Sequence, residues 1–169
     1  MLEGGYDLPP RMFTAEEIDA VMLGASWVLN NGDPDIQRAA ADILSKVEAV
    51  LPNDRRGLMQ KARQVVPKID TAPEIKIHMP TVRQSIRDHS KVKTEYVRED
   101  GTPSVRVLYP LVTVFFQNIQ LLVAWCELRQ SFRNFRMDRF KSYTPLGETF
   151  SARIFEELDD YLRRQREAG

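Results

Sequence analysis

Apolar residues in the first part of the chain recur at the three- and four-residue spacing of amphipathic helices. One stripe runs from Ile18 to Leu29 and a second from Ile36 to Val50. Thr14 and Glu17 have the spacing of a capping box, which marks a helix start just before the first stripe. We predict a helix for each stripe and a third helix over 54–65, which together form a small helical bundle or flange.

From Lys91 the hydrophobic pattern changes to the two-residue period of β-strands. Lys91 to Arg98 is predicted as a strand, and Asp100-Gly101 is a strong hairpin-turn signal. The return strand contains Tyr109-Pro110-Leu111, where the proline predicts a sheet edge or a bend. Lys141 to Phe150 is predicted as the last strand. About five short antiparallel strands favour a small barrel or a strongly bent sheet, because closure removes exposed edges.

Leu121 to Phe140 is predicted to be a hairpin around which this sheet is organised. Its first strand is apolar on both faces, so both faces should be covered. Its second strand carries Arg133, Arg136 and Arg139. Guanidinium groups on a rigid scaffold suit a carboxylate or a phosphate.

Two further helices are predicted beside the strands. Thr81 to His89 forms a short helix with Val82 facing inward, and Ser151 to Arg166 forms an amphipathic helix. The pattern therefore predicts an α+β fold with a boundary between residues 78 and 79. Residues 1–78 form a linker and helical segment, and residues 79–169 form the β-rich domain with its flanking helices.

Composition and charge limit the partners and the cellular location that the sequence can indicate. The 169 residues contain 24 basic and 24 acidic side chains, so bulk charge gives no argument for nucleic acid. The run from Arg129 to Lys141 nevertheless holds five basic residues and one acidic residue. No segment has the roughly 18 apolar residues that span a membrane. With one cysteine and no signal sequence, the chain is expected to be cytoplasmic.

Motifs for catalysis or metal binding are missing from the pattern. Two histidines and one cysteine offer no zinc-ligand spacing, and neither a glycine-rich phosphate loop nor a nucleophile elbow is present. We expect no cofactor, no metal and no enzymatic activity. Cys126 is predicted to be a buried small hydrophobe. Trp125 is predicted to belong to the core, with a stacking platform for a base as the alternative.

Three stretches give the chain a resemblance to a known family. They are Tyr6 to Thr14, Ala124 to Arg129 and Phe132 to Phe140. In order and spacing they resemble the WYL-domain family of bacterial transcriptional regulators, in the short form that has one helix-turn-helix domain and one WYL domain. The chain departs from the family pattern at two places: it has Gln120-Leu121-Leu122 in place of Trp-x-Leu, and Tyr109-Pro110-Leu111 in place of Arg-Pro-Leu.

The resemblance implies an Sm- or SH3-like barrel that senses a ligand, often a nucleic acid or nucleotide, and adjusts a helix-turn-helix domain. That domain is attached to the sensor or separate from it. The chain begins where the family's DNA-binding domain would end, and no helix pair here has the short turn and basic recognition helix of that motif. Duplex DNA binding by this chain alone is therefore not expected.

A ligand site is predicted on the sheet, with single-stranded nucleic acid or a nucleotide as the partner. Alternation puts Arg133 and Arg139 on one face and Arg136 on the other, unless a bulge or turn near Asp138 re-aims Arg139. Tyrosines on neighbouring strands are expected to line the same pocket, although each tyrosine could instead belong to the core. The predicted ligand-binding residues are Tyr96, Arg106, Tyr109, Arg133, Arg136 and Arg139.

Two other interpretations compete with the ligand site. The arginines could be a solvated or ion-paired sheet face, with Asp138, Glu127 and Glu148 as partners. The domain could also be a ligand-free interaction module that serves dimer assembly. The apolar stripes of the first helices leave room for a homodimer, and no membrane partner is expected.

Overall fold

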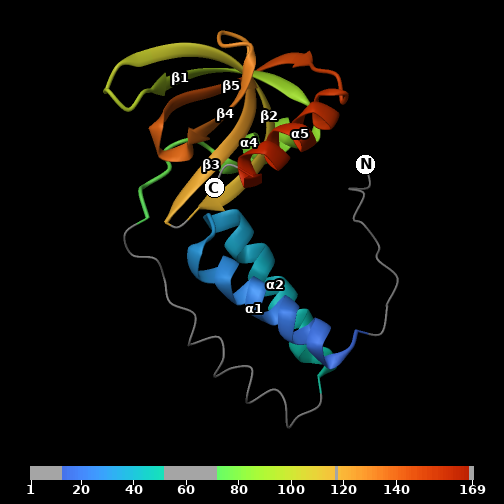
Figure 1. The fold of residues 1–169 in the computed structure, drawn as a ribbon. Coiled ribbons are helices and arrows are strands. Elements are labelled where there is room, and N and C mark those ends of the chain that lie inside the picture. The colour runs from blue at the N-terminus through green and yellow to red at the C-terminus, as the bar shows by residue number, and fades with distance from the viewer. Residues whose placement is uncertain (1–12, 52–71, 117, 168–169) are drawn as a thin grey trace. The chain divides into compact units, whose positions relative to one another are not determined.

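The computed structural model describes residues 13–51, 72–116 and 118–167. The chain divides into two compact units, residues 1–69 and residues 70–169. The first unit holds two described helices, and the second holds a five-stranded antiparallel sheet with flanking helices (Figure 1). The predicted order of N-terminal helices, antiparallel sheet and C-terminal helix is confirmed. The helix predicted over 54–65 lies outside the described residues.

In the first unit, helices α1 (Ala15–Asn31) and α2 (Pro34–Val50) pack against each other. The predicted capping box is present: the Glu17 backbone N–H donates to the Thr14 hydroxyl, and the Thr14 N–H donates to the Glu17 carboxylate at 2.7 Å. Leu44 is fully buried at the centre of the pair. The packed apolar residues are Ile18, Met22, Ala25, Val28, Leu29, Ala40, Leu44, Val47 and Leu51.

The buried stripes of this pair are narrower than the sequence predicts. Val21, Ile43 and Val50 belong to the apolar patterns, yet they are exposed. A helix that packs on a single partner helix buries a narrow seam, whereas a helix on a broad core buries an apolar stripe more than 100° wide. The described helices α1 and α2 bury the narrow seam.

The second unit is built on a sheet whose strands lie in the order β4-β3-β2-β1-β5, and all neighbours are antiparallel. The strands are β1 (Ser90–Val97), β2 (Pro103–Phe116), β3 (Ile119–Cys126), β4 (Ser131–Arg136) and β5 (Phe140–Thr149). The predicted Leu121–Phe140 hairpin is confirmed as β3 and β4, and the predicted last strand is confirmed as β5.

A short connection forces this sheet to curl. Strands β4 and β5 are the two edges of the sheet, yet only the 3₁₀ turn η1 (Met137–Arg139) joins them. Four interstrand spacings in a flat sheet would separate the edges by about 19 Å. The four Cα–Cα steps from Arg136 to Phe140 reach at most about 14 Å. The edges therefore approach each other, although β4 and β5 do not pair and the sheet stays open.

Both faces of strand β3 are covered, as its apolar sequence predicts. Leu122, Ala124 and Cys126 face one core, which includes residues of helix α4 (Met79–Arg87). Val123 faces a second core, which includes residues of helix α5 (Ile154–Glu167). Cys126 is fully buried, as predicted. Helix α4 fits the predicted short helix, and Val82 on it is fully buried.

The predicted bend at Pro110 is also present. The register of β2 against β3 shifts between Pro110 and Val112, which places a bulge at Leu111. The pairing of β2 with β1 ends at Leu108, so Pro110 has a strand neighbour on the β3 side alone. A proline has no N–H to donate, and this position requires none on the β1 side.

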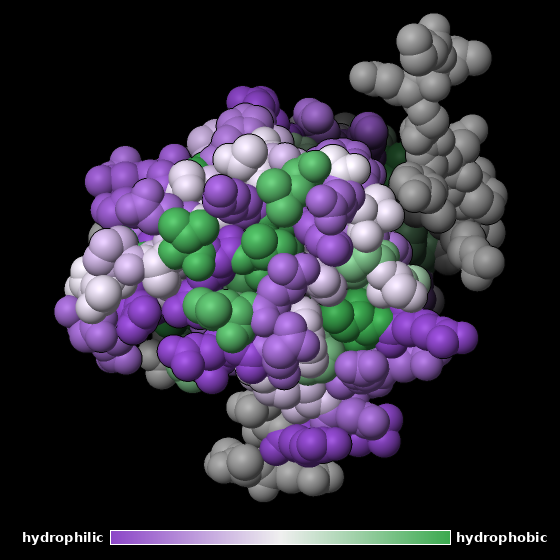
Figure 2. Space-filling view, turned by 90° about the horizontal axis from the view of Figure 1, so that it is seen from above, coloured by the Kyte–Doolittle hydropathy of each residue, from purple (hydrophilic) through white to green (hydrophobic). Residues whose placement is uncertain are grey.

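The surface seen in Figure 2 is dominated by hydrophilic residues, and hydrophobic residues are exposed there in small, separate groups.

The enclosed core of the sheet should dominate the stability of the second unit. Phe140 is fully buried and its ring contacts those of Tyr96 and Tyr143. We expect Phe140→Ala to lower the free energy of unfolding by about 3–5 kcal/mol. Urea denaturation followed by Trp125 fluorescence, in a Trp27→Phe background, measures the change.

The matched control is Phe116→Ala, because Phe116 is 58% exposed at the end of β2. It should change the free energy of unfolding by no more than about 0.5 kcal/mol. Equal destabilisation by the two substitutions would contradict this location of the core.

Candidate functional site

Four of the six predicted ligand-binding residues line one pocket of about 480 Å³. They come from different parts of the curled sheet: Tyr96 from β1, Arg106 from β2, Arg133 from β4 and Arg139 from η1. The volume lies in the range of ligand-binding clefts. We use the name arginine pocket for this cavity, whose lining is completed by Arg98, Glu99, Arg129, Phe132, Asn134, Phe135 and Tyr161.

Arg133 and Arg139 meet at the pocket, although they lie on different elements. Strict strand alternation puts Arg133 and Arg139 on one face and Arg136 on the other. Strand β4 ends at Arg136 and residues Met137–Arg139 form a 3₁₀ turn, and Arg139 lines the pocket with Arg133. The sequence allowed for a turn near Asp138, and this turn is present as η1.

Arg106 is the most unusual side chain in the pocket. It is only 6% exposed, and among the described residues no carboxylate forms an ion pair with it. Its Nε donates to the Ser104 hydroxyl at 3.2 Å, and its Nη1 lies 3.6 Å from Cys126 Sγ. Buried charges in proteins are normally paired, because desolvation of an unpaired charge is expensive. The pocket therefore holds a guanidinium that lacks an anionic partner within the described chain.

The lining as a whole is strongly positive. Five arginines and one carboxylate, Glu99, surround the cavity. Arg129 belongs to the basic run in the sequence, and its position in the turn between β3 and β4 places it here. Arg98 was missed by sequence reasoning, because it follows β1 and its proximity depends on the curl of the sheet. Such a concentration of one charge in a concave site favours an anion.

Tyr96 forms part of the pocket wall and also braces it. Its hydroxyl accepts a hydrogen bond of 3.3 Å from the backbone N–H of Arg136. Its ring packs edge-on against Phe135 and Phe140, with centroid distances of 5.1 and 5.2 Å. The side chain thus links β1 to β4 and β5, and so fixes the width of the pocket.

Arg136 does not line the arginine pocket. Its Nε and Nη2 donate to the two carboxylate oxygens of Asp138 at 3.1 and 3.0 Å. This hydrogen-bonded pair raises the pKa of Arg136 above its ordinary value. The bidentate pair holds the turn η1 and engages the guanidinium, and Arg136 is not among the predicted residues that this cavity brings together.

Tyr109 also lies outside the arginine pocket. Its hydroxyl donates to Glu127 Oε1 at 2.7 Å, and its ring stacks on Phe150 at a centroid distance of 5.1 Å. Lys91 Nζ lies 5.2 Å from the centre of the ring. Burial, followed by the bond to Glu127, raises the pKa of the Tyr109 hydroxyl. This tyrosine joins the strands to the segment that leads into α5.

The carboxylates that could have neutralised the arginines are engaged elsewhere. Asp138 pairs with Arg136. Glu148 and Glu127 lie 3.2 and 3.6 Å from Lys91 Nζ, and the bond to Glu148 raises the pKa of Lys91. Arg133 and Arg139 have no ion pair to a carboxylate in the described part of the chain. The ion-paired interpretation of this face therefore fits Arg136 alone.

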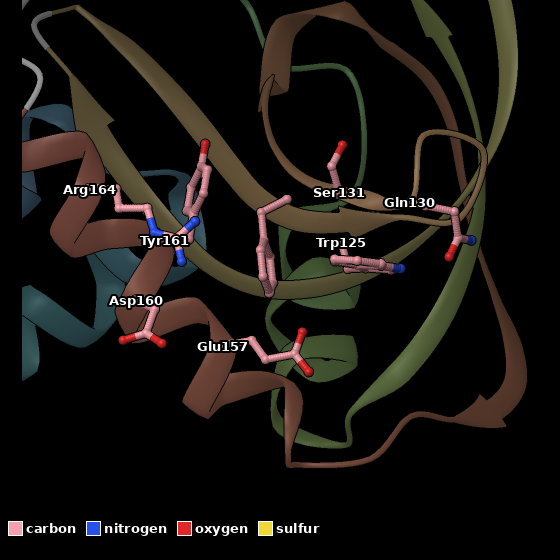
Figure 3. Close-up of a pocket in the computed structure, with 8 residues that line it drawn as sticks. Trp125, Gln130, Ser131, Glu157, Asp160, Tyr161 and Arg164 are labelled. Carbon is pink, nitrogen blue, oxygen red and sulfur yellow. The ribbon is translucent and has the colours of Figure 1, made fainter.

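A second cavity, of about 380 Å³, lies between the sheet and α5 (Figure 3). Trp125, Gln130 and Ser131 lie on the sheet side, and Glu157, Asp160, Tyr161 and Arg164 lie on the helix. Phe132 also lines it. Trp125 was predicted to belong to the core, but it is half-buried and belongs to no core cluster. We use the name helix pocket for this cavity.

The described residues offer no other obvious chemistry. No three acidic, histidine or cysteine side chains among them converge as metal ligands. No described helix is long and apolar enough to cross a membrane.

Comparison with known proteins identifies the β-rich segment. Residues 78–145 match the family model described as the WYL domain. Among solved structures, the chain is similar to proteasome accessory factor B/C (PafBC) of Arthrobacter aurescens. The TM-score is 0.44 and the identity is 22%, over 83% of this chain and 22% of that one. The chain thus spans less than a quarter of that protein.

The buried guanidinium of Arg106 leads to a prediction about stability. In Arg106→Met the buried charge is replaced by an apolar side chain, so we expect the free energy of unfolding to rise by about 1–3 kcal/mol. Urea denaturation measures the change. Low concentrations of tripolyphosphate should stabilise the unaltered protein by binding and stabilise the variant less.

The control is Arg133→Met, at an exposed position of the same pocket. Its effect on the free energy of unfolding should stay within about 0.5 kcal/mol. Marked destabilisation by Arg106→Met would mean that the bonds to Ser104 and Cys126 already satisfy the guanidinium.

Proposed function

We propose that the chain is the effector-sensing part of a bacterial transcription regulator. Its arginine pocket binds an anionic ligand, either single-stranded nucleic acid or a nucleotide, and binding controls a helix-turn-helix domain that is attached or separate. The observation that carries the proposal is Arg106, a buried guanidinium to which the described residues offer no carboxylate partner and which opens onto a cavity with four more arginines.

The chemistry of the pocket favours phosphate over other anions. Guanidinium groups bind phosphate and carboxylate oxygens through paired hydrogen bonds. Aromatic side chains stand among the arginines, and Phe132 and Tyr161 are both only partly buried. Arginines interleaved with aromatic rings are typical of single-strand binding sites, where phosphates meet the charges and bases stack on the rings.

The curled sheet acts as an Sm- or SH3-like barrel with β4 and β5 as its open seam. Residues 79–169 are the sensor domain, and residues 1–78 form the linker and helical segment that leads to the DNA-binding domain.

Regulation requires that the ligand favours one of two states of the protein. Tyr161 brings α5 into the arginine pocket, so a bound ligand contacts the sheet and the C-terminal helix together. A difference in these contacts between two states would couple ligand binding to the DNA-binding domain. In known allosteric systems the coupling free energy between two sites is about 1–3 kcal/mol.

Fluorescence anisotropy with labelled short single-stranded DNA and RNA tests the proposal. Saturable binding is expected to weaken as salt rises, because protein–phosphate contacts release counterions. Arg133→Glu should weaken binding at least about tenfold, since it removes a charge-assisted hydrogen bond and adds repulsion. The salt dependence of the variant should be shallower by about 0.7 in logarithmic slope for each phosphate that the variant no longer neutralises.

Arg87→Glu is the matched control, because it makes the same charge change at an exposed position on α4 that does not line the pocket. It should leave affinity within about twofold after screening by moderate salt. Equal weakening in the two variants would mean that only net charge matters. No binding of nucleic acid, nucleotide or tripolyphosphate would leave the ligand-free assembly module as the better description.

A further inference from the structure

The helix pocket and the arginine pocket are neighbours. They share two lining residues, Phe132 from β4 and Tyr161 from α5, whose ring centroids lie 5.4 Å apart. A ligand held by the arginines can therefore extend past this aromatic pair into the helix pocket. In a nucleotide, a sugar separates the phosphate from the base in the same way, so the two cavities match the two ends of one ligand.

The two cavities differ in chemistry. The arginine pocket has five basic side chains and one acidic one, whereas the helix pocket has two carboxylates, Glu157 and Asp160, and one arginine. The helix pocket also has Trp125, whose ring lies 5.0 Å from that of Phe132. A flat aromatic ligand finds stacking surfaces here, but a phosphate would be repelled by the carboxylates.

Of the two carboxylates, Glu157 is the better candidate for contact with a ligand. Asp160 lies 4.0 Å from the guanidinium of Arg163 on its own helix, and in Figure 3 it points away from the sheet. Glu157 forms no ion pair within the described residues. Figure 3 shows it extending from α5 on the side where Trp125 lies.

We propose that the helix pocket is a base subsite that selects guanine, with Glu157 as the group that reads the base. This inference rests on the proposed function, because the arginine pocket must hold the phosphate of the same ligand. A carboxylate presents two acceptors side by side and no donor. Guanine alone among the common bases presents two adjacent donors, N1–H and the N2 amino group, on its pairing edge.

The other bases fit the carboxylate less well. Adenine places an unprotonated N1 beside its amino group, so the second carboxylate oxygen would face a lone pair. Cytosine has the same arrangement at N3, and uracil or thymine has one N–H between two carbonyl oxygens. Ser131, on the sheet side of the pocket, adds a hydroxyl that can donate to O6 or N7 of guanine.

Competition against labelled oligothymidylate, measured by anisotropy, tests this assignment. GMP should displace the oligonucleotide at about 5- to 100-fold lower concentration than AMP, the factor expected for one bidentate base contact. IMP, which lacks the N2 amino group, should fall between them. Guanosine should compete poorly, because it has no phosphate for the arginine pocket.

Two variants separate the base subsite from the phosphate site. Glu157→Gln replaces one acceptor by a donor, so it should remove most of the preference for GMP over AMP. It should weaken GMP competition and strengthen AMP competition, because an amide matches the amino donor and the N1 acceptor of adenine. Asp160→Asn is the control and should keep the full preference. Circular dichroism checks that both exposed substitutions leave the fold intact.

The outcomes distinguish this inference from the proposed function. Equal competition by GMP and AMP, with neither competing in Arg133→Glu, would overturn the guanine subsite and leave the anion site standing. A GMP preference that survives in Glu157→Gln would also overturn it, because another group would then read the base. Failure of the oligonucleotide and of every nucleotide to bind would overturn both proposals.

Discussion

The short connection between the two edge strands is the constraint on which the second unit depends. Three residues in a 3₁₀ turn join β4 to β5, so a five-stranded sheet cannot lie flat. The curl brings the β1–β2 hairpin, with Arg98 and Arg106, toward β4 and η1, with Arg133 and Arg139. The bidentate pair between Arg136 and Asp138 spans the same turn. One arginine is thus used to shape the connection that gathers the others.

Helices, turns and strands that have local sequence signals are predicted well from the sequence. The meeting of side chains from distant strands in one pocket is predicted poorly. The capping box at Thr14, the turn at Asp100-Gly101 and the doubly apolar strand β3 have short-range causes, and each is present. Arg98 lies outside the basic run of the sequence, and its approach to Arg133 depends on the curvature of the sheet. The position of Tyr109 on β2 predicts that it lines the pocket. The register shifts at Leu111, and the Tyr109 ring stacks on Phe150 in the core cluster that includes residues of α5.

The two departures from the family pattern fall away from the arginine pocket. Gln120 pairs with Phe115 near the end of the β2–β3 hairpin, and neither residue lines the cavity. Tyr109 is held by Glu127 and Phe150, and it does not line the cavity either. Neither departure therefore falls on a residue that lines the arginine pocket.

The burial of Arg106 has a consequence for how this protein would evolve. Mutational drift at an ordinary core position is restrained by the loss of stability that most substitutions cause. At position 106 we expect the restraint to be reversed, because an apolar side chain should suit the desolvated surroundings better than a guanidinium does. Under the proposed function, a lineage under selection for folding alone would lose this arginine, so its persistence among relatives would record selection for binding of an anion.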